Sequence, residues 1–252
     1  MLSSKIMNRA CRLLHDPQLQ FCRTFSFLAN YRNAVAAVPV VNSVGNQKHG
    51  SGSRLFCSHP ISRFPIPDKK DLPQDMQERM NEVEEKSGFL PNVFKALAHR
   101  PDEFRAFFAY YDALMMKETG SLTKADKEMI VTATSAENDC LYCVVAHGAL
   151  MRIYSKNRIT ADQVAINWKT AELDERQRAI LRFALDVCHS RTITESHFAD
   201  LEKNGLDRED AWDIGAIAAL FALSNRMAHL TDMRPNEEFY LMGRIPREKK
   251  KE

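Results

Sequence analysis

Residues 137–147 read ENDCLYCVVAH and bring two cysteines and a histidine together at helical spacing. The short polar side chains before the first cysteine are typical helix caps, so we expect a helix over about 140–154. Side chains three and four positions apart lie on one face of a helix. Cys140, Cys143 and His147 are therefore predicted to share a face.

This spacing favours thiol chemistry. If Asn138 or Asp139 caps the helix, Cys140 lies in its first turn, where unpaired N–H groups and the positive helix end favour a thiolate. Cys143 follows within reach of a disulfide after modest adjustment. His147 stands one turn beyond Cys143, and an imidazole over that sulfur can accept the thiol proton.

A carboxylate is predicted opposite this histidine. If the chain reverses near Asn138 into two antiparallel helices, Glu128 lies ten residues before the turn and His147 nine residues after it. At about 1.5 Å per residue the two side chains are almost level. A carboxylate facing His147 would orient the ring and stabilise its protonated form. The alternative for Glu128 is a solvated charge on the helix surface.

The same pattern has two other interpretations. A CxxC followed by a histidine could supply three of four zinc ligands, with the fourth from His189, His197 or His229, although none of these has a ligand-like spacing. The pair could also be inert packing. We favour redox chemistry and expect no metal. Cys188 lies on an apolar helical stripe and is expected in the core.

Helix signals are dense beyond residue 65 and strand signals are scarce, so the sequence predicts an all-α class. Thr123 with Asp126, Thr160 with Gln163, and Asp174 are expected to mark helix starts. Helices are expected over 72–86 (ending at Gly88), 91–98, from 101, from 123, 140–154, from 160, from 174, from 194 to Gly205, and 207–228.

The N-terminal region has the composition of a mitochondrial presequence. Residues 1–67 carry eight Lys or Arg against the single acid Asp16, and three of the six cysteines, Cys11, Cys22 and Cys57, lie there. Mitochondrial presequences are rich in Arg and Ser and poor in acids. We expect residues 1–64 to be a disordered presequence that directs the protein to mitochondria, with the matrix favoured. A plain tail and another destination stay open.

The rest of the chain excludes some classes of protein. Removing the eight basic residues and Asp16 from 35 basic and 33 acidic residues leaves 27 against 32, so the predicted domain is mildly acidic. This argues against a nucleic-acid-binding surface. The longest apolar run, residues 214–223, is too short to span a bilayer, and we expect a buried helix there and no membrane span. The predicted domain covers 65–240, and a charged tail covers 241–252.

The motif consists of Glu128, eleven intervening residues, Cys140-Leu141-Tyr142-Cys143 and then His147. This pattern resembles that of the alkylhydroperoxidase D/carboxymuconolactone decarboxylase superfamily, and most of all its peroxidase-related branch. The resemblance covers roughly residues 65–240. It implies a single all-helical domain of the alkylhydroperoxidase D type that assembles as homotrimers or hexamers.

The resemblance also implies an activity and a role for each residue. The protein would be a peroxiredoxin-type oxidoreductase in which Cys143 attacks a hydroperoxide and Cys140 closes a disulfide. His147 and Glu128 would form the proton relay. Tyr142 departs from the family pattern, which has a histidine at this position. A phenol donates hydrogen bonds but is no base near neutrality, so Tyr142 could not replace that histidine as a proton acceptor. An unidentified dithiol would reduce the enzyme, without haem, flavin or any other cofactor.

Three rival functions remain at the level of sequence. Lactone decarboxylation belongs to the same superfamily, but that branch does not rely on a CxxC pair. A non-catalytic regulatory or scaffold protein would not need both cysteines. A reductase of protein disulfides would need the dithiol but little peroxide turnover.

Overall fold

The structure is a computed structural model that describes residues 60–244, and in this range it is helical with no strand, which confirms the all-α class. The presequence expected over 1–64 lies outside this range up to residue 59, and so does the charged tail from residue 245. No described helix is long and apolar enough to cross a membrane. The α-helices are α3 Gln74–Ser87, α4 Asn92–Leu97, α5 Pro101–Met115, α6 Lys124–Glu137, α7 Leu141–Ser155, α8 Thr160–Asn167, α9 Glu175–Cys188, α10 Glu195–Lys203, α11 Arg208–Thr231 and α12 Glu237–Leu241.

Local capping rules set several helix ends. Thr123 and Asp126 form a reciprocal capping box at the start of α6, as expected. Gly88 ends α3 with a φ of 88°, in the left-handed region that glycine adopts without a steric penalty. The capping box expected at Thr160 is wrong, because Thr160 already lies inside α8. Asn157 acts instead, and its side-chain oxygen accepts the amide of Thr160 at 3.2 Å.

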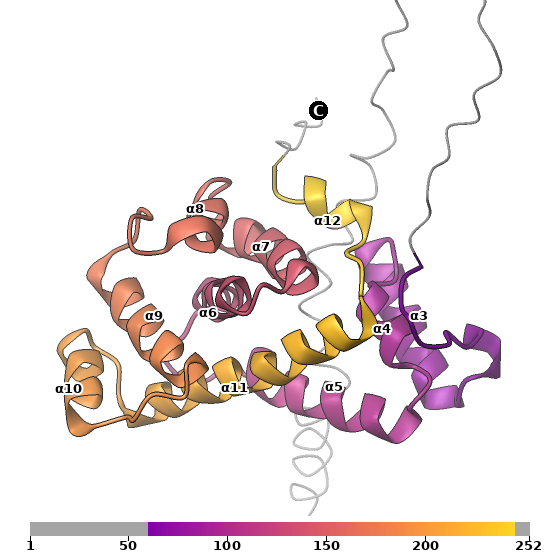
Figure 1. Ribbon diagram of the computed structural model, residues 1–252, viewed down its shortest axis with the longest axis horizontal. Coiled ribbons are helices and arrows are strands. Elements are labelled where there is room, and N and C mark those ends of the chain that lie inside the picture. Colours follow the sequence, from indigo (N-terminus) through magenta and orange to yellow (C-terminus); the bar gives the residue numbers. More distant parts are fainter. Residues whose placement is uncertain (1–59, 245–252) are drawn as a thin grey trace, which may run out of the picture.

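Helix α6 forms the centre of the fold. Figure 1 shows it nearly end-on, with α7, α8, α9 and α11 around it, and each of these helices contacts it. Residues 126–135 of α6 are buried without a break, so its polar side chains need internal partners. The buried Lys127 ammonium donates to the carbonyls of Leu114 at 2.9 Å, in the last turn of α5, and of Lys117 at 2.7 Å, just beyond that helix.

The long helix α11 and the C-terminal segment close the domain. Figure 1 shows α11 running from α10 across to the side of α4 and α5, and it contacts α5, α6, α7 and α9. The C-terminal segment folds back over α7, where the buried Arg152 guanidinium donates to the carbonyls of Met242 at 2.9 Å and Phe239 at 3.0 Å. At the other end of the described chain, the Arg63 amide donates to the Thr231 carbonyl of α11 at 2.7 Å.

Candidate active site

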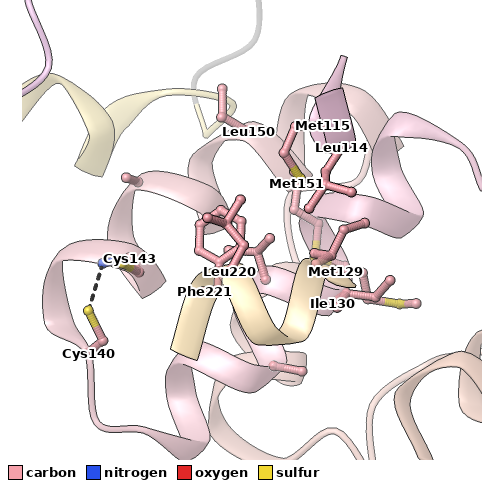
Figure 2. Close-up of a cluster of buried hydrophobic side chains, with 14 of the residues drawn as sticks. Leu114, Met115, Met129, Ile130, Cys140, Cys143, Leu150, Met151, Leu220 and Phe221 are labelled. Carbon is pink, nitrogen blue, oxygen red and sulfur yellow. Dashed lines mark hydrogen bonds between the residues drawn. The ribbon is translucent and has the colours of Figure 1, made fainter. Parts of the chain in front are cut away.

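A tight turn between α6 and α7 places the cysteine pair. Asp139 has a φ of 52°, a left-handed conformation that aspartate tolerates better than most residues, and the next amide, of Cys140, donates to the Ser135 carbonyl at 2.9 Å. The expected cap at Asn138 or Asp139 is wrong by one or two residues. Cys140 itself is the N-cap, and its sulfur accepts the Cys143 amide at 3.4 Å (Figure 2).

The two thiols are free and buried, and their pKa values are shifted in opposite directions. Cys140 is 2% exposed and Cys143 is 1% exposed. The hydrogen bond donated by the Cys143 thiol, together with the Cys143 amide and the Asn225 side chain, lowers the pKa of Cys140 to about 6. The same thiol–thiol bond, with burial, raises the pKa of the Cys143 thiol well above its usual range. In the reduced pair the charge therefore rests on Cys140 while Cys143 keeps its proton.

The predicted carboxylate–imidazole pair is present. Nδ1 of His147 lies 2.7 Å from Oε2 of Glu128, and the two residues are 9% and 3% exposed, so the expectation that they face each other is confirmed. The carboxylate accepts from Nδ1–H, which leaves the lone pair of a neutral ring on Nε2. Phe221 of α11 meets the His147 ring edge-to-face at 4.7 Å between centroids and holds its plane.

A small apolar cavity of about 60 Å³ lies beside His147 and one of the two cysteines. Cys143 and His147 both line it, and Cys140 is not part of its wall, so a reagent inside the cavity would meet the Cys143 sulfur. The remaining wall is mostly aromatic and includes Phe94, Phe107, Phe108, Tyr111, Phe221 and Phe239. Within the cavity wall, Ser224 contacts Cys143, with its Oγ 3.8 Å from Sγ, and the Asn225 side chain also interacts with this sulfur. Across residues 60–244 no hydrogen bond joins His147 to Cys143, although both face the cavity.

Tyr142, expected at the site as a phenol able to donate a hydrogen bond, accepts one in the structure. Its hydroxyl accepts the Val93 amide of α4 at 3.1 Å, and its ring forms part of the cavity wall. Burial raises the pKa of this phenol, so it stays neutral and cannot serve as a base. Tyr142 thus ties α4 to α7 beside the cavity.

Ser224 and Asn225 are site residues that the sequence did not single out. They stand where the longest apolar run of the sequence ends, and two polar residues in the middle of a core helix are the signal that could have found them. Asn225 is fully buried, its amide donates to Ser135 at 2.9 Å, and its oxygen accepts from Asn138 at 3.0 Å. Cys188, expected in the core, is half-buried and accepts from the same Asn138 amide at 3.4 Å.

The histidines weighed as zinc ligands lie apart from the cysteine pair or have other partners. His189 faces Glu137 at 3.4 Å, His197 faces Asp186 at 3.4 Å, and His229 contacts the Asn138 carbonyl at 2.8 Å. In the described part of the chain, no group of three His, Cys, Asp or Glu side chains could hold a metal ion.

Comparisons with known proteins agree with this architecture. The model of the carboxymuconolactone decarboxylase family matches residues 101–166. The alkylhydroperoxidase AhpD core of an uncharacterized peroxidase-related protein from Ralstonia eutropha JMP134 is 60% identical, with a TM-score of 0.74 over 75% of this chain and 100% of that one. An uncharacterized peroxidase-related protein from Silicibacter sp. TM1040 is 35% identical, with a TM-score of 0.69 over 73% and 97%.

The likeness to a more distant structure is evidence for the fold alone. The debrominase Bmp8 is 22% identical, with a TM-score of 0.60 over 73% of this chain and 96% of that chain. The comparison with curated proteins found no match.

Proposed function

Since the chain belongs to the alkylhydroperoxidase D/carboxymuconolactone decarboxylase superfamily, we propose that it is a thiol-dependent peroxidase that reduces organic hydroperoxides with Cys140 and Cys143. One observation supports this most directly. Cys143 lines an apolar cavity together with His147, and His147 is held by Glu128 at 2.7 Å. A reacting sulfur, a proton carrier and an apolar substrate space are thus adjacent.

The first step oxidises Cys143. Its sulfur attacks the terminal oxygen of the hydroperoxide, so an S–O bond forms, the O–O bond breaks and the alkoxide leaves. His147 accepts the thiol proton on Nε2 and delivers it to the leaving oxygen, giving an alcohol and a sulfenic acid. Glu128 stabilises the imidazolium that exists between these two transfers.

The second step uses the charge that rests on Cys140. The Cys140 thiolate attacks the Cys143 sulfenic acid, an S–S bond forms, and the expelled hydroxide takes a proton to become water. The two sulfurs have then given two electrons to the peroxide. An external dithiol returns the disulfide to two thiols by exchange.

The burial of both sulfurs favours this proposal over the reduction of protein disulfides. With exposures of 2% and 1%, Cys140 and Cys143 are closed to a folded protein substrate. The Cys143 cavity, whose wall is almost entirely apolar, instead suits a small organic molecule such as a hydroperoxide. A regulatory scaffold would need neither the buried thiols nor the Glu128–His147 pair.

The test is peroxide consumption by the full chain with Cys11, Cys22 and Cys57 replaced by alanine. The reduced protein is mixed with cumene hydroperoxide, and peroxide loss and free thiols are followed together. We expect two thiols to disappear per peroxide, no turnover in Cys143→Ser, and a trapped sulfenic acid in Cys140→Ser. Peroxide loss at an unchanged rate in Cys143→Ser would contradict the proposal.

We also propose a homo-oligomer, with the trimer or hexamer implied by the resemblance. An open apolar groove of about 560 Å³ between α5 and α11 supports this, since Tyr110, Leu223 and Leu230 are each about half exposed there. Light scattering on Leu230→Asp tests the proposal. A charge at the interface is expected to reduce the particle to a smaller assembly, and an unchanged mass would place the interface elsewhere.

The basic N-terminal region supports import into mitochondria, with the matrix as the proposed compartment. Residues 1–64 fused to a fluorescent protein should direct it to mitochondria, and replacement of the six arginines by glutamine should abolish import. A cytosolic signal from the unchanged fusion would overturn this proposal.

A further inference from the structure

Ser224 contacts the Cys143 sulfur, and the mechanism proposed above gives this hydroxyl no role. We propose that the Ser224 hydroxyl donates a hydrogen bond to the Cys143 sulfur whenever that sulfur carries negative charge, which makes Ser224 a catalytic residue of this site. The inference deepens the proposed function and rests on it for the peroxidase arm of its test only.

The geometry supports donation toward the sulfur. Ser224 Oγ lies 3.8 Å from the Cys143 Sγ, and both side chains line the apolar cavity. The hydroxyl of Thr231, on the same helix, instead donates to the carbonyl four residues earlier at 2.8 Å, as helical hydroxyls often do. Within residues 60–244 no such bond is found for Ser224. Its hydroxyl is therefore available to the sulfur.

The register between α7 and α11 fixes this contact. Phe221 packs on His147, and Ser224, one turn later on α11, meets Cys143, one turn earlier on α7. The two helices thus run antiparallel through the site. Asn225, fully buried and bonded to Ser135 on α6, holds the rotation of α11 about its axis.

A thiolate at Cys143 requires a hydrogen-bond donor because the neighbouring Cys140 already carries negative charge. The resting charge lies on Cys140, so ionisation of Cys143 brings a second negative charge close to the first in a buried place. Cys143 is not placed like Cys140, whose sulfur accepts an amide at the start of α7. A neutral O–H pointing at Cys143 stabilises its anion without adding a charge, and Ser224 keeps its proton throughout.

The direct test measures the Cys143 thiolate alone. In a Cys140→Ser background, which removes the neighbouring thiolate, the rate of Cys143 alkylation by iodoacetamide is followed against pH by peptide mass spectrometry. We expect Ser224→Ala to move the midpoint upward by about one pH unit, since a hydrogen bond to a charged group is worth about tenfold in the ionisation equilibrium. Ser224→Thr keeps a hydroxyl and should restore most of the shift.

Ser155→Ala is the matched control. Ser155 is a half-buried serine at the far end of α7 whose hydroxyl donates to the Met151 carbonyl at 2.6 Å, away from the cysteines. Its removal should leave the Cys143 midpoint where it was. Circular dichroism and the unfolding midpoint of each variant show whether the fold is kept, because Ser224→Ala removes only one oxygen.

The second arm uses turnover with both cysteines present. Ser224→Ala should lower kcat/KM for cumene hydroperoxide about tenfold, with Ser224→Thr close to the unchanged protein. An unchanged alkylation profile in Ser224→Ala overturns the inference, whatever the turnover. A shifted profile in a protein that consumes no peroxide upholds the role of Ser224 and overturns the proposed peroxidase activity.

Discussion

The Glu128–His147 contact gives a buried carboxylate its hydrogen-bond donor and also positions the histidine of the proposed reaction. Both residues are at most 9% exposed and lie 2.7 Å apart. An enclosed carboxylate that faces a histidine fixes its tautomer and stabilises its charged form.

Glu128→Gln keeps the shape of the side chain but loses its charge. We expect kcat/KM for cumene hydroperoxide to fall roughly ten- to a hundredfold, by analogy with the loss of a carboxylate partner from a metal-bound histidine. Glu137→Gln is the control, because Glu137 lies on the same helix and faces another histidine, His189, at 3.4 Å, but is exposed. Equal losses in the two variants would remove Glu128 from the relay.

The lowered pKa of Cys140, about 6, predicts a thiolate near neutrality. Thiolate absorbance of the reduced protein should rise with a midpoint near pH 6 and move upward in Cys143→Ala, which removes the thiol donor. Since the folded pKa lies below the unfolded one, near 9, this thiolate stabilises the fold fully above pH 9, and the contribution is lost as pH falls to about 6. Denaturant unfolding at several pH values, compared with Cys140→Ala, measures this slope, and a parallel pH dependence would contradict the assignment.

At the scale of elements, α6 and α7 act as one hairpin that brings together Glu128, His147 and both cysteines. The turn at Asp139 and the capping box at the start of α6 fix the register of this hairpin. The uninterrupted burial of residues 126–135 makes α6 the helix against which four others pack. A weakened α6 should therefore lower the stability of the whole domain.

Thr123→Ala removes the capping hydroxyl that accepts the Asp126 amide at 3.1 Å. We expect the free energy of unfolding to fall by about 1 kcal/mol, the usual value for a lost N-cap. Thr170→Ala is the control, since that exposed hydroxyl bonds only within its own turn, to the Asn167 carbonyl at 3.2 Å. Urea unfolding of both variants measures the difference, and no loss in Thr123→Ala would mean that tertiary packing alone fixes α6.

At the scale of the whole molecule, the cavity at Cys143 exists only because distant segments close around it. Helix α5 supplies Phe107 and Phe108, α11 supplies Phe221, and the C-terminal α12 supplies Phe239. Phe239 is 3% exposed and meets Phe89 edge-to-face at 5.0 Å between centroids. Its ring therefore contributes both to stability and to the size of the cavity.

Phe239→Ala enlarges the cavity at a cost in stability. The free energy of unfolding should fall by about 3–5 kcal/mol, as for other buried phenylalanines cut to alanine. The ratio of kcat/KM for cumene hydroperoxide to that for tert-butyl hydroperoxide should rise, because the bulkier peroxide gains more room. Steady-state kinetics at a temperature where the variant stays folded checks this, and a falling ratio would place the substrate elsewhere.

The sequence alone determined the features that depend on neighbours along the chain. The caps at Thr123 and Asp174, the end of α3 at Gly88 and the level placement of Glu128 and His147 all follow from helix geometry over a few turns. The error at Thr160 has the same local origin, because Asn157, three residues before it, supplied a competing cap.

Tertiary packing sets which residues from other helices reach the cysteines. Ser224 meets Cys143 across 81 positions of sequence, and Phe239 closes the cavity from a still more distant segment. These contacts depend on how α11 and α12 pack against α7, which no spacing rule encodes. The charge on Cys140 has a mixed origin, since the thiol and amide of Cys143, three residues along the chain, lower its pKa, and the tertiary structure adds the opposing effect of burial and the favourable contact with Asn225.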